Sequence, residues 1–404
     1  MGASLDDLFK RVLSAKIFVN RDLLRPDYIP QDLPHRERQI FKLAEIVAPV
    51  LKGSRPSNIF IYGVPGTGKT AVTKYVMGKV NAEVSSKGLS LQTAFINCKN
   101  DDTNYRVIAD LCEQIGERVP FTGLAASELY KRFVRIVEGS NSPIFVILDE
   151  VDSLVKKAGD EILYKLTRVN EKLDEKQSRS RVSIIGITND LKFTEYLDPR
   201  VRSSLGEEEL VFPPYNASEL EDILRQRADG AFHPGILGLE VIKLCSALAA
   251  KEHGDARRAL DLLRVAGELA ERNGESKVTE EHVRRAQKEV EKDRVVEVVK
   301  TMPLHSRLLI LSLHLLEKRG KKGGTTGEVY EVYSGAAKGF GIETLTQRRV
   351  SDLINELDML GIANAKVVSK GRYGRTKLVS LSISERNLRD ALQEDPRMAS
   401  YISR

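Results

Sequence analysis

The stretch that decides the fold of this chain is GVPGTGKT at residues 63–70, which follows the apolar run NIFIY at residues 58–62. It fills every fixed position of the pattern G-x-x-x-x-G-K-[ST], the P-loop that holds phosphates between a strand and a helix. Glycines at positions 63, 66 and 68 can adopt backbone angles closed to other residues, so successive amide groups can turn toward one phosphate. A glycine-rich turn that binds nothing is the alternative. The strand-like run before the loop and the helix-like run at residues 71–76 favour the phosphate site.

The residue types of the loop predict separate roles. Lys69 supplies positive charge to the outer phosphates, and the Thr70 hydroxyl is placed to hold Mg²⁺. The other residues of the loop that we expect around a nucleotide are Gly63, Pro65, Gly66, Thr67 and Gly68.

A second apolar run, residues 144–148, ends in Asp149 and Glu150. A continuous apolar run predicts a strand that is buried on both faces of a parallel sheet, and ligands lie beyond the carboxyl ends of such strands. We expect Asp149 to hold Mg²⁺ and Glu150 to orient or deprotonate an attacking water. The alternative is that this acidic pair caps the following helix. Asp152 stays open between a helix cap and a site residue.

A third apolar run, residues 182–188, ends at Asn189. Because polar residues at the ends of neighbouring parallel strands meet at one sheet edge, Asn189 is a candidate to touch the γ-phosphate or to hold the water. As a residue before Asp190, it could also be an ordinary turn residue.

Further motifs accompany these runs: IPQDLPHRE at 29–37, TN at 188–189, FPPY at 212–215 with Arg227 twelve residues later, and GDARRAL at 254–260. Together they resemble the AAA+ ATPases, and in particular the archaeal replication initiators related to the origin recognition complex and to the cell-division-control helicase loader. The likeness extends from about residue 22 to about residue 383. It implies an adenine-side element at Leu33, Pro34, His35 and Arg36, a sensor 1 at Asn189 and a sensor 2 at Arg257. It also implies that Tyr215 and Arg227 line the nucleotide.

Plainer interpretations of these residues remain. Tyr215 and Arg227 could be lid packing and a solvated helix charge, and His35 could simply start a helix. Neighbouring helix positions face about 100° apart, so only one of Arg257 and Arg258 can aim at the phosphates, and the apolar pattern favours Arg257. The resemblance implies that an arginine finger, supplied between subunits, lies near residues 198–204. Arg200 or Arg202 could serve, but neither falls cleanly on the Ser-Arg pair of other AAA+ branches, which puts strong trans-activated hydrolysis in doubt.

The resemblance implies an α/β AAA+ P-loop core with a parallel sheet and helices on both faces, an α-helical lid and a C-terminal winged-helix domain. The expected division is an N-terminal helical segment at 1–20, the core at 21–215, the lid at 216–296 and the winged helix at 297–404. The implied ligands are ATP or ADP with Mg²⁺, turned over slowly as a switch. The implied partners are double-stranded origin DNA, a replicative helicase of the minichromosome-maintenance type and other initiator protomers.

Charge supports a polyanion partner for the last quarter of the chain. Residues 301–404 carry 17 Lys and Arg against 11 Asp and Glu, which is the whole net charge of +6. An excess confined to one module is typical of a nucleic-acid-binding surface, although a basic surface can also serve solubility. No run of 18 apolar residues or secretory signal is present, so we expect a cytoplasmic, nucleoid-associated protein without a membrane partner. Cys98, Cys112 and Cys245 have no spacing that predicts a disulfide framework or a zinc site.

The same quarter has the pattern of a winged helix. Helices are expected at 304–318, from 326 to 333 and at 344–360, and strands at 365–369 and 376–382. The start of the third helix would meet base edges through Thr346, Gln347, Arg348 and Arg349. The hairpin tip would meet phosphates and a groove through Lys370, Arg372, Tyr373 and Arg375, unless it is only a polar turn. Residues 117–123 fit a DNA-contacting insertion and a connecting loop equally well. Two rival functions remain, a clamp-loader-like AAA+ machine and a nucleotide-gated transcription regulator.

Overall fold

The structure is a computed structural model that describes residues 17–101, 103–116, 118–119, 123–205, 208–318, 323–369, 375–393, 395 and 398–399. The chain divides into two compact units, Met1–Val283 and Arg284–Arg404, and each is described by itself.

A five-stranded parallel sheet forms the centre of the first unit, with the strand order β2-β3-β4-β1-β5. The strands are β1 (Ile59–Tyr62), β2 (Gln92–Asn97), β3 (Pro143–Asp149), β4 (Arg181–Thr188) and β5 (Glu208–Val211). The three apolar runs are confirmed as strands β1, β3 and β4, which lie side by side in the middle of the sheet. Their carboxyl ends therefore bring Gly63, Asp149 and Asn189 to one edge.

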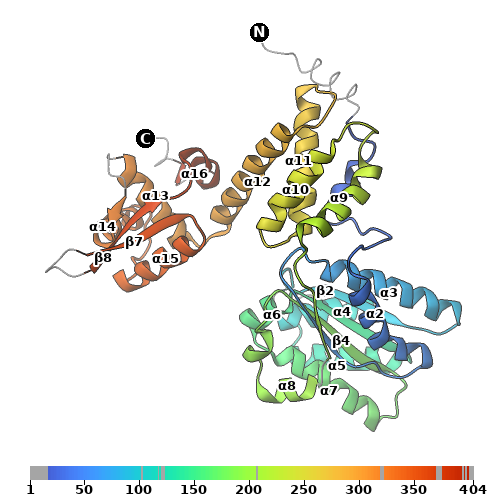
Figure 1. The fold of residues 1–404 in the computed structure, drawn as a ribbon. Helices are drawn as coiled ribbons and strands as arrows, with labels where there is room; N and C mark the ends of the chain where they lie inside the picture. Colours follow the sequence, from blue (N-terminus) through green and yellow to red (C-terminus); the bar gives the residue numbers. More distant parts are fainter. Residues whose placement is uncertain are drawn as a thin grey trace. The chain divides into compact units, whose positions relative to one another are not determined.

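Helices cover both faces of this sheet (Figure 1). On one face, α2 (Glu37–Val47) and α3 (Lys69–Ser86) pack on Ile59, Ile61, Ile147 and Ile185. The other face packs on α4 (Asn104–Ile115), α5 (Ala126–Gly139), α6 (Val151–Ala158), α7 (Glu161–Glu175) and α8 (Pro199–Leu205). Alternate strand residues thus enter opposite cores, which is why the strands are apolar at nearly every position. Short 3-10 helices occur at η1 (Arg21–Leu24), η2 (Ala48–Lys52) and η3 (Phe193–Tyr196).

The lid consists of helices α9 (Ala217–Ala231), α10 (Leu239–Lys251), α11 (Ala256–Asn273) and the beginning of α12 (Glu280–Thr301). The expected helical lid is confirmed. The N-terminal residues 17–25 were expected to divide between a helical segment and the core. They pack on the lid instead, where the Val19 amide donates to the Ala231 carbonyl at 2.8 Å. Residues 1–16 lie outside the described part of the chain.

The second unit has the winged-helix order. Its elements are α13 (Leu304–Lys318), β6 (Gly324–Thr325), α14 (Thr326–Gly339), α15 (Gln347–Met359), β7 (Ala363–Ser369), β8 (Arg375–Leu381) and α16 (Glu385–Leu392). The strands pair antiparallel in the order β6-β8-β7. Both strands of the expected hairpin are confirmed. The third helix begins at residue 347 rather than 344, because the Thr346 hydroxyl caps it by accepting from the Arg349 amide.

Among the described residues, no helix combines the length and the apolar character needed to cross a membrane. The three cysteines are buried.

Candidate functional site

The P-loop joins β1 to α3 through a backbone that only glycine adopts easily. Gly66 and Gly68 have φ values of 74° and 89°, in the left-handed region. The Thr67 hydroxyl donates to the Val64 carbonyl at 2.8 Å and folds the loop on itself. Lys69, the first residue of α3, donates through Nζ to the Gly63 carbonyl at 2.6 Å and to the Asn189 Oδ1 at 2.9 Å. Burial lowers the pKa of Lys69 to about 8, although the Asp149 carboxylate acts in the opposite direction.

The acidic pair lies at the end of β3 beside this lysine. Asp149 Oδ2 accepts from the Thr70 hydroxyl at 2.9 Å, and its Oδ1 accepts from the Glu150 amide at 3.1 Å. Burial raises the pKa of Asp149, and the bond from Thr70 opposes that rise. Glu150 has a φ of 55°, which is strained for a residue with a side chain. It occupies the N-cap position of α6 without a side-chain cap bond, so the structure gives no support to capping as its role.

Asp152 forms hydrogen bonds at the end of β4. Its Oδ1 accepts from the Thr188 hydroxyl at 3.1 Å and from the Asn189 amide at 3.3 Å. Asp152 therefore fixes the strand end that carries Asn189, and acts on the site through that residue.

Arg257 reaches the same place from the lid. Asp255, the N-cap of α11, accepts from the Arg257 amide at 2.8 Å, and the Ala256 amide donates to the Gly66 carbonyl at 3.2 Å. Arg258 turns away and pairs with Glu252 at 2.9 Å. The structure thus places Arg257 beside the P-loop and the acidic pair, as the helix periodicity favoured.

A polar cavity of about 110 Å³ collects these groups. Its lining includes Pro65, Gly66, Thr67, Gly68, Lys69, Thr70, Asn97, Asp149, Glu150, Asn189 and Arg257. Asn97 was missed in the sequence, although it is the last residue of β2 and Asn189 directly follows β4, so the same rule would have found it.

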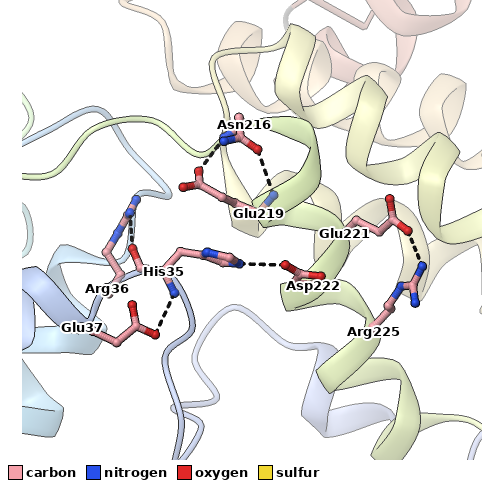
Figure 2. Close-up of polar contacts among 8 residues, drawn as sticks. All are labelled: His35, Arg36, Glu37, Asn216, Glu219, Glu221, Asp222 and Arg225. Atoms are coloured by element: carbon pink, nitrogen blue, oxygen red, sulfur yellow. Dashed lines mark hydrogen bonds and ion pairs between the residues drawn. The ribbon is translucent and has the colours of Figure 1, made fainter.

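A larger cavity of about 390 Å³ adjoins the P-loop and has a mainly apolar wall. The sequence-predicted residues Leu33, Pro34, Tyr215 and Arg227 line it, together with Tyr28, Ile29, Ile223 and Leu260. Its described lining does not include His35 or Arg36, which were expected on the adenine side. His35 pairs instead with Asp222 on α9, with 3.0 Å between Nε2 and Oδ2 (Figure 2).

Arg36 is buried beside the P-loop and is only 1% exposed. Its Nε donates to the Thr67 carbonyl at 2.9 Å and its NH2 to the Pro213 carbonyl at 2.7 Å. The guanidinium stacks 3.6 Å from the centroid of the Tyr215 ring, and burial raises the pKa of that tyrosine to about 12. A buried guanidinium requires such acceptors, so Arg36 ties the P-loop to the connection that leads into the lid.

The two arginines considered for a finger lie on α8. Arg200 is 82% exposed and forms a two-point pair with its neighbour Asp198 at 3.1 Å. The described lining of neither cavity includes Arg200 or Arg202.

The first turn of α15 presents the residues expected at base edges. Thr346, Gln347, Arg348 and Arg349 are all exposed. Tyr330 and Tyr333 of α14 hold the residue before this turn: the Tyr330 hydroxyl donates to the Leu345 carbonyl at 3.1 Å, and the Leu345 amide donates to the Tyr333 hydroxyl at 3.3 Å.

The expected wing tip is only partly described. Lys370, Arg372 and Tyr373 lie outside the described residues, as does much of residues 117–123. Arg375 begins β8, but its side chain is not among those described.

Comparison with known proteins agrees with this architecture. Residues 52–193 match the AAA domain, residues 221–288 the Cdc6 AAA+ ATPase-type lid domain, and residues 297–391 the CDC6 C-terminal winged-helix domain. The chain is 54% identical to the ORC1-type DNA replication protein 1 of Sulfurisphaera tokodaii, over the full length of both. The chain belongs to the ORC1-type DNA replication proteins.

Solved structures of similar proteins share the fold of this ORC1-type chain. The Aeropyrum pernix ORC1 protein, solved in complex with DNA, is 50% identical, with a TM-score of 0.85 and coverage of 96% of this chain and 99% of that one. The Aeropyrum pernix ORC2 protein, solved in ADPNP-ADP complexes, is 24% identical with a TM-score of 0.63 over 96% of this chain and 98% of that one. The second likeness supports the fold alone.

Proposed function

We propose that this chain is a replication initiator that binds ATP or ADP between its core and lid and binds origin duplex DNA through its C-terminal unit. One observation carries the nucleotide part of the proposal. Lys69, Asp149 and Asn189 of the core line the same polar cavity as Arg257 of the lid. A γ-phosphate in that cavity would be contacted from both sides, so the lid position would depend on which nucleotide is bound.

The donor set fits Mg²⁺, which prefers oxygen ligands and usually keeps waters and phosphate oxygens around it. The Thr70 hydroxyl and the Asp149 carboxylate are 2.9 Å apart and would hold it. When bound, the ion would neutralise charge on the phosphates. No cluster of three His, Cys, Asp or Glu side chains occurs among the described residues, so a metal bound by protein carboxylates and imidazoles alone is not supported there.

The chain's own residues divide the slow ATPase chemistry among them. Lys69 supplies fixed positive charge to the β- and γ-phosphates, and Asn189 orients the attacking water or the γ-phosphate. Glu150 accepts the proton of that water or holds the water in line. Arg257 contacts the γ-phosphate from the lid and reports its presence.

The DNA part of the proposal rests on α15 and on the charge of the second unit. The exposed Gln347, Arg348 and Arg349 would approach base edges in the major groove. Lys370, Arg372, Tyr373 and Arg375 of the wing would contact the backbone and the adjacent groove. The similar Aeropyrum pernix ORC1 protein was solved in complex with DNA, which supports this role. Membership of the ORC1-type family supports three further parts of this role: recruitment of a minichromosome-maintenance-type helicase, contacts with other initiator protomers and a nucleoid location.

Two variants test the nucleotide site and the DNA-binding helix separately. Lys69→Ala should abolish ATP and ADP binding in calorimetric titration, and unchanged affinity would refute the nucleotide site. Arg348→Ala with Arg349→Ala should weaken binding to duplex DNA and reduce the slope of affinity against salt by up to about two. Arg389→Ala, which removes an exposed cation from α16, is the control and should leave the slope unchanged. Genome occupancy then separates an initiator, which should occupy one or a few origins, from a promoter-binding regulator.

A further inference from the structure

One wall of the larger cavity is made by a segment that is attached to the lid. Its beginning, residues 17–25, packs on lid helices: the rings of Phe18 and Phe232 are 4.7 Å apart, and Arg21 pairs with Glu271 of α11 at 3.0 Å. The segment then runs past the cavity as residues 26–34, seven of which belong to its lining. We call residues 17–34 the strap.

Arg227 of α9 grips the strap just before and within this lining. Its NH1 donates to the Leu23 carbonyl at 3.1 Å and its NH2 to the Tyr28 carbonyl at 3.2 Å. Its guanidinium lies 4.6 Å from the centroid of the Tyr28 ring. Arg227 is 8% exposed, so these two carbonyls take the place of water at its terminal nitrogens.

The same helix holds the chain again just after the lining. Asp222, just over one turn before Arg227, pairs with His35 at 3.0 Å (Figure 2). The next residue, Arg36, is fixed to the P-loop and to the Pro213 carbonyl. The wall is thus fastened to α9 at both of its ends, and toward its end Leu33 also packs on the hydrophobic core of the sheet.

Residues 26–34 form no helix or strand of their own and contain three prolines, Pro26, Pro30 and Pro34. A segment without internal hydrogen bonds takes its position from its attachments. Because Arg227 and Asp222 both lie on α9, these attachments tie the wall to the lid, whereas the phosphate-binding loop belongs to the core.

We propose that Arg227 is a positioning residue that holds the base-side wall on the lid, rather than a residue that binds the nucleotide phosphates. The inference rests on the nucleotide site proposed above and assigns its base-binding half to the strap. A base between the strap and the core then stabilises one lid position. A ligand with phosphates but no base leaves the strap unused.

Two ligands distinguish this role: MgATP and magnesium tripolyphosphate, which has the phosphates of ATP without the nucleoside. Arg227→Met keeps the length of the side chain and removes its donors. We expect its affinity for ATP to fall about tenfold or more, as the loss of two charge-assisted hydrogen bonds predicts, with tripolyphosphate affinity changed by less than about twofold. An equal loss for both ligands, or no loss for ATP, would overturn the inference.

The matched control is Arg225→Met on the same helix. Arg225 pairs with Glu221 (Figure 2) and is not among the described residues that line the larger cavity. The Arg225→Met variant should leave the affinities for ATP and for tripolyphosphate unchanged. Lys69→Ala should lose both ligands; if it loses neither, the phosphate site itself is wrong, which is a different failure from that of the strap.

A second variant and a second measurement cover the case in which Arg227→Met does not fold. The Asp222→Asn, His35→Gln double variant frees the other attachment, which is partly exposed and should not be needed for folding. It should also weaken ATP binding more than tripolyphosphate binding. In hydrogen exchange, ATP should protect residues 27–33 of the wild type, and tripolyphosphate should not. Equal protection by the two ligands would contradict the proposal.

Discussion

Replacement of the buried Arg36 by methionine should destabilise the first unit by an amount that the structure allows to be worked out. The change leaves the Thr67 and Pro213 carbonyls without their donor, at about 1–3 kcal/mol each. It also removes a desolvated cation over the Tyr215 ring, worth about 2 kcal/mol. Against this stands the cost of burying the guanidinium, which is visible in the lowered pKa of Arg36. We expect a net loss of about 2–4 kcal/mol.

Scanning calorimetry of the full chain measures this loss. The transition that moves to higher temperature with ATP belongs to the nucleotide-binding unit. A loss of this size should lower its midpoint by about 5–15 °C. Arg38→Met, which removes an exposed cation two residues away, is the control and should have little effect. A shift for Arg36→Met no larger than that of the control would refute the reasoning. In the double variant with Tyr215→Leu the two losses should not add, because the residues are in contact.

Three further predictions concern the P-loop and the winged helix. Burial lowers the pKa of Lys69 to about 8, and bound phosphates would raise it again, so the affinity for ATP should fall up to tenfold per pH unit above pH 8 in calorimetric titrations. Lys69→Arg stays charged over this range and should show no such fall. A wild-type affinity that is constant from pH 7 to about 9.5 would contradict the prediction. Gly66→Ala should lower the midpoint of the same calorimetric transition, because φ is 74° at this position and a Cβ would lie 1.7 Å from the Asp255 Oδ1. Adding Asp255→Gly to this variant should restore part of the lost midpoint temperature. A double variant without any recovery would exclude the clash as the cause. Tyr333→Phe removes the acceptor of the Leu345 amide and should weaken DNA binding several-fold. The slope of affinity against salt should stay unchanged in binding titrations, because no phosphate contact is lost. A changed slope would count against a positioning role for Tyr333.

Local pattern was sufficient to predict the core of the fold. The runs ending at Asp149 and Asn189 are apolar because their strands are covered on both faces, so strand type, burial and the shared sheet edge follow from one signal. The P-loop was equally predictable, since its glycines, lysine and threonine stand in one octapeptide. The choice of Arg257 over Arg258 needed only the helical period.

The attachments between distant segments were not predictable in this way. Arg36 donates to a residue 177 positions later, and His35 pairs with one 187 positions later. An arginine inside a charged stretch is normally exposed, so nothing local distinguishes the buried Arg36 from its exposed neighbour Arg38. Most of the strap, residues 21–34, was predicted to belong to the core because it precedes the P-loop in the chain, whereas its partners on α9 and α11 come after the sheet. The predicted roles of the wing residues remain predictions.

The hydrogen bond from the Ala256 amide to the Gly66 carbonyl joins lid and P-loop through main-chain atoms alone. Alanine scanning would not detect this bond, and substitutions other than proline at position 256, or any substitution that keeps the backbone at position 66, would leave it in place. Proline is the one natural residue that can cut it. Position 256 is the first residue of α11, where proline's fixed φ suits a helix and only the amide hydrogen is lost. Ala256→Pro would therefore weaken the coupling between nucleotide binding and the position of the lid, while leaving every side chain that is proposed to contact the nucleotide unchanged.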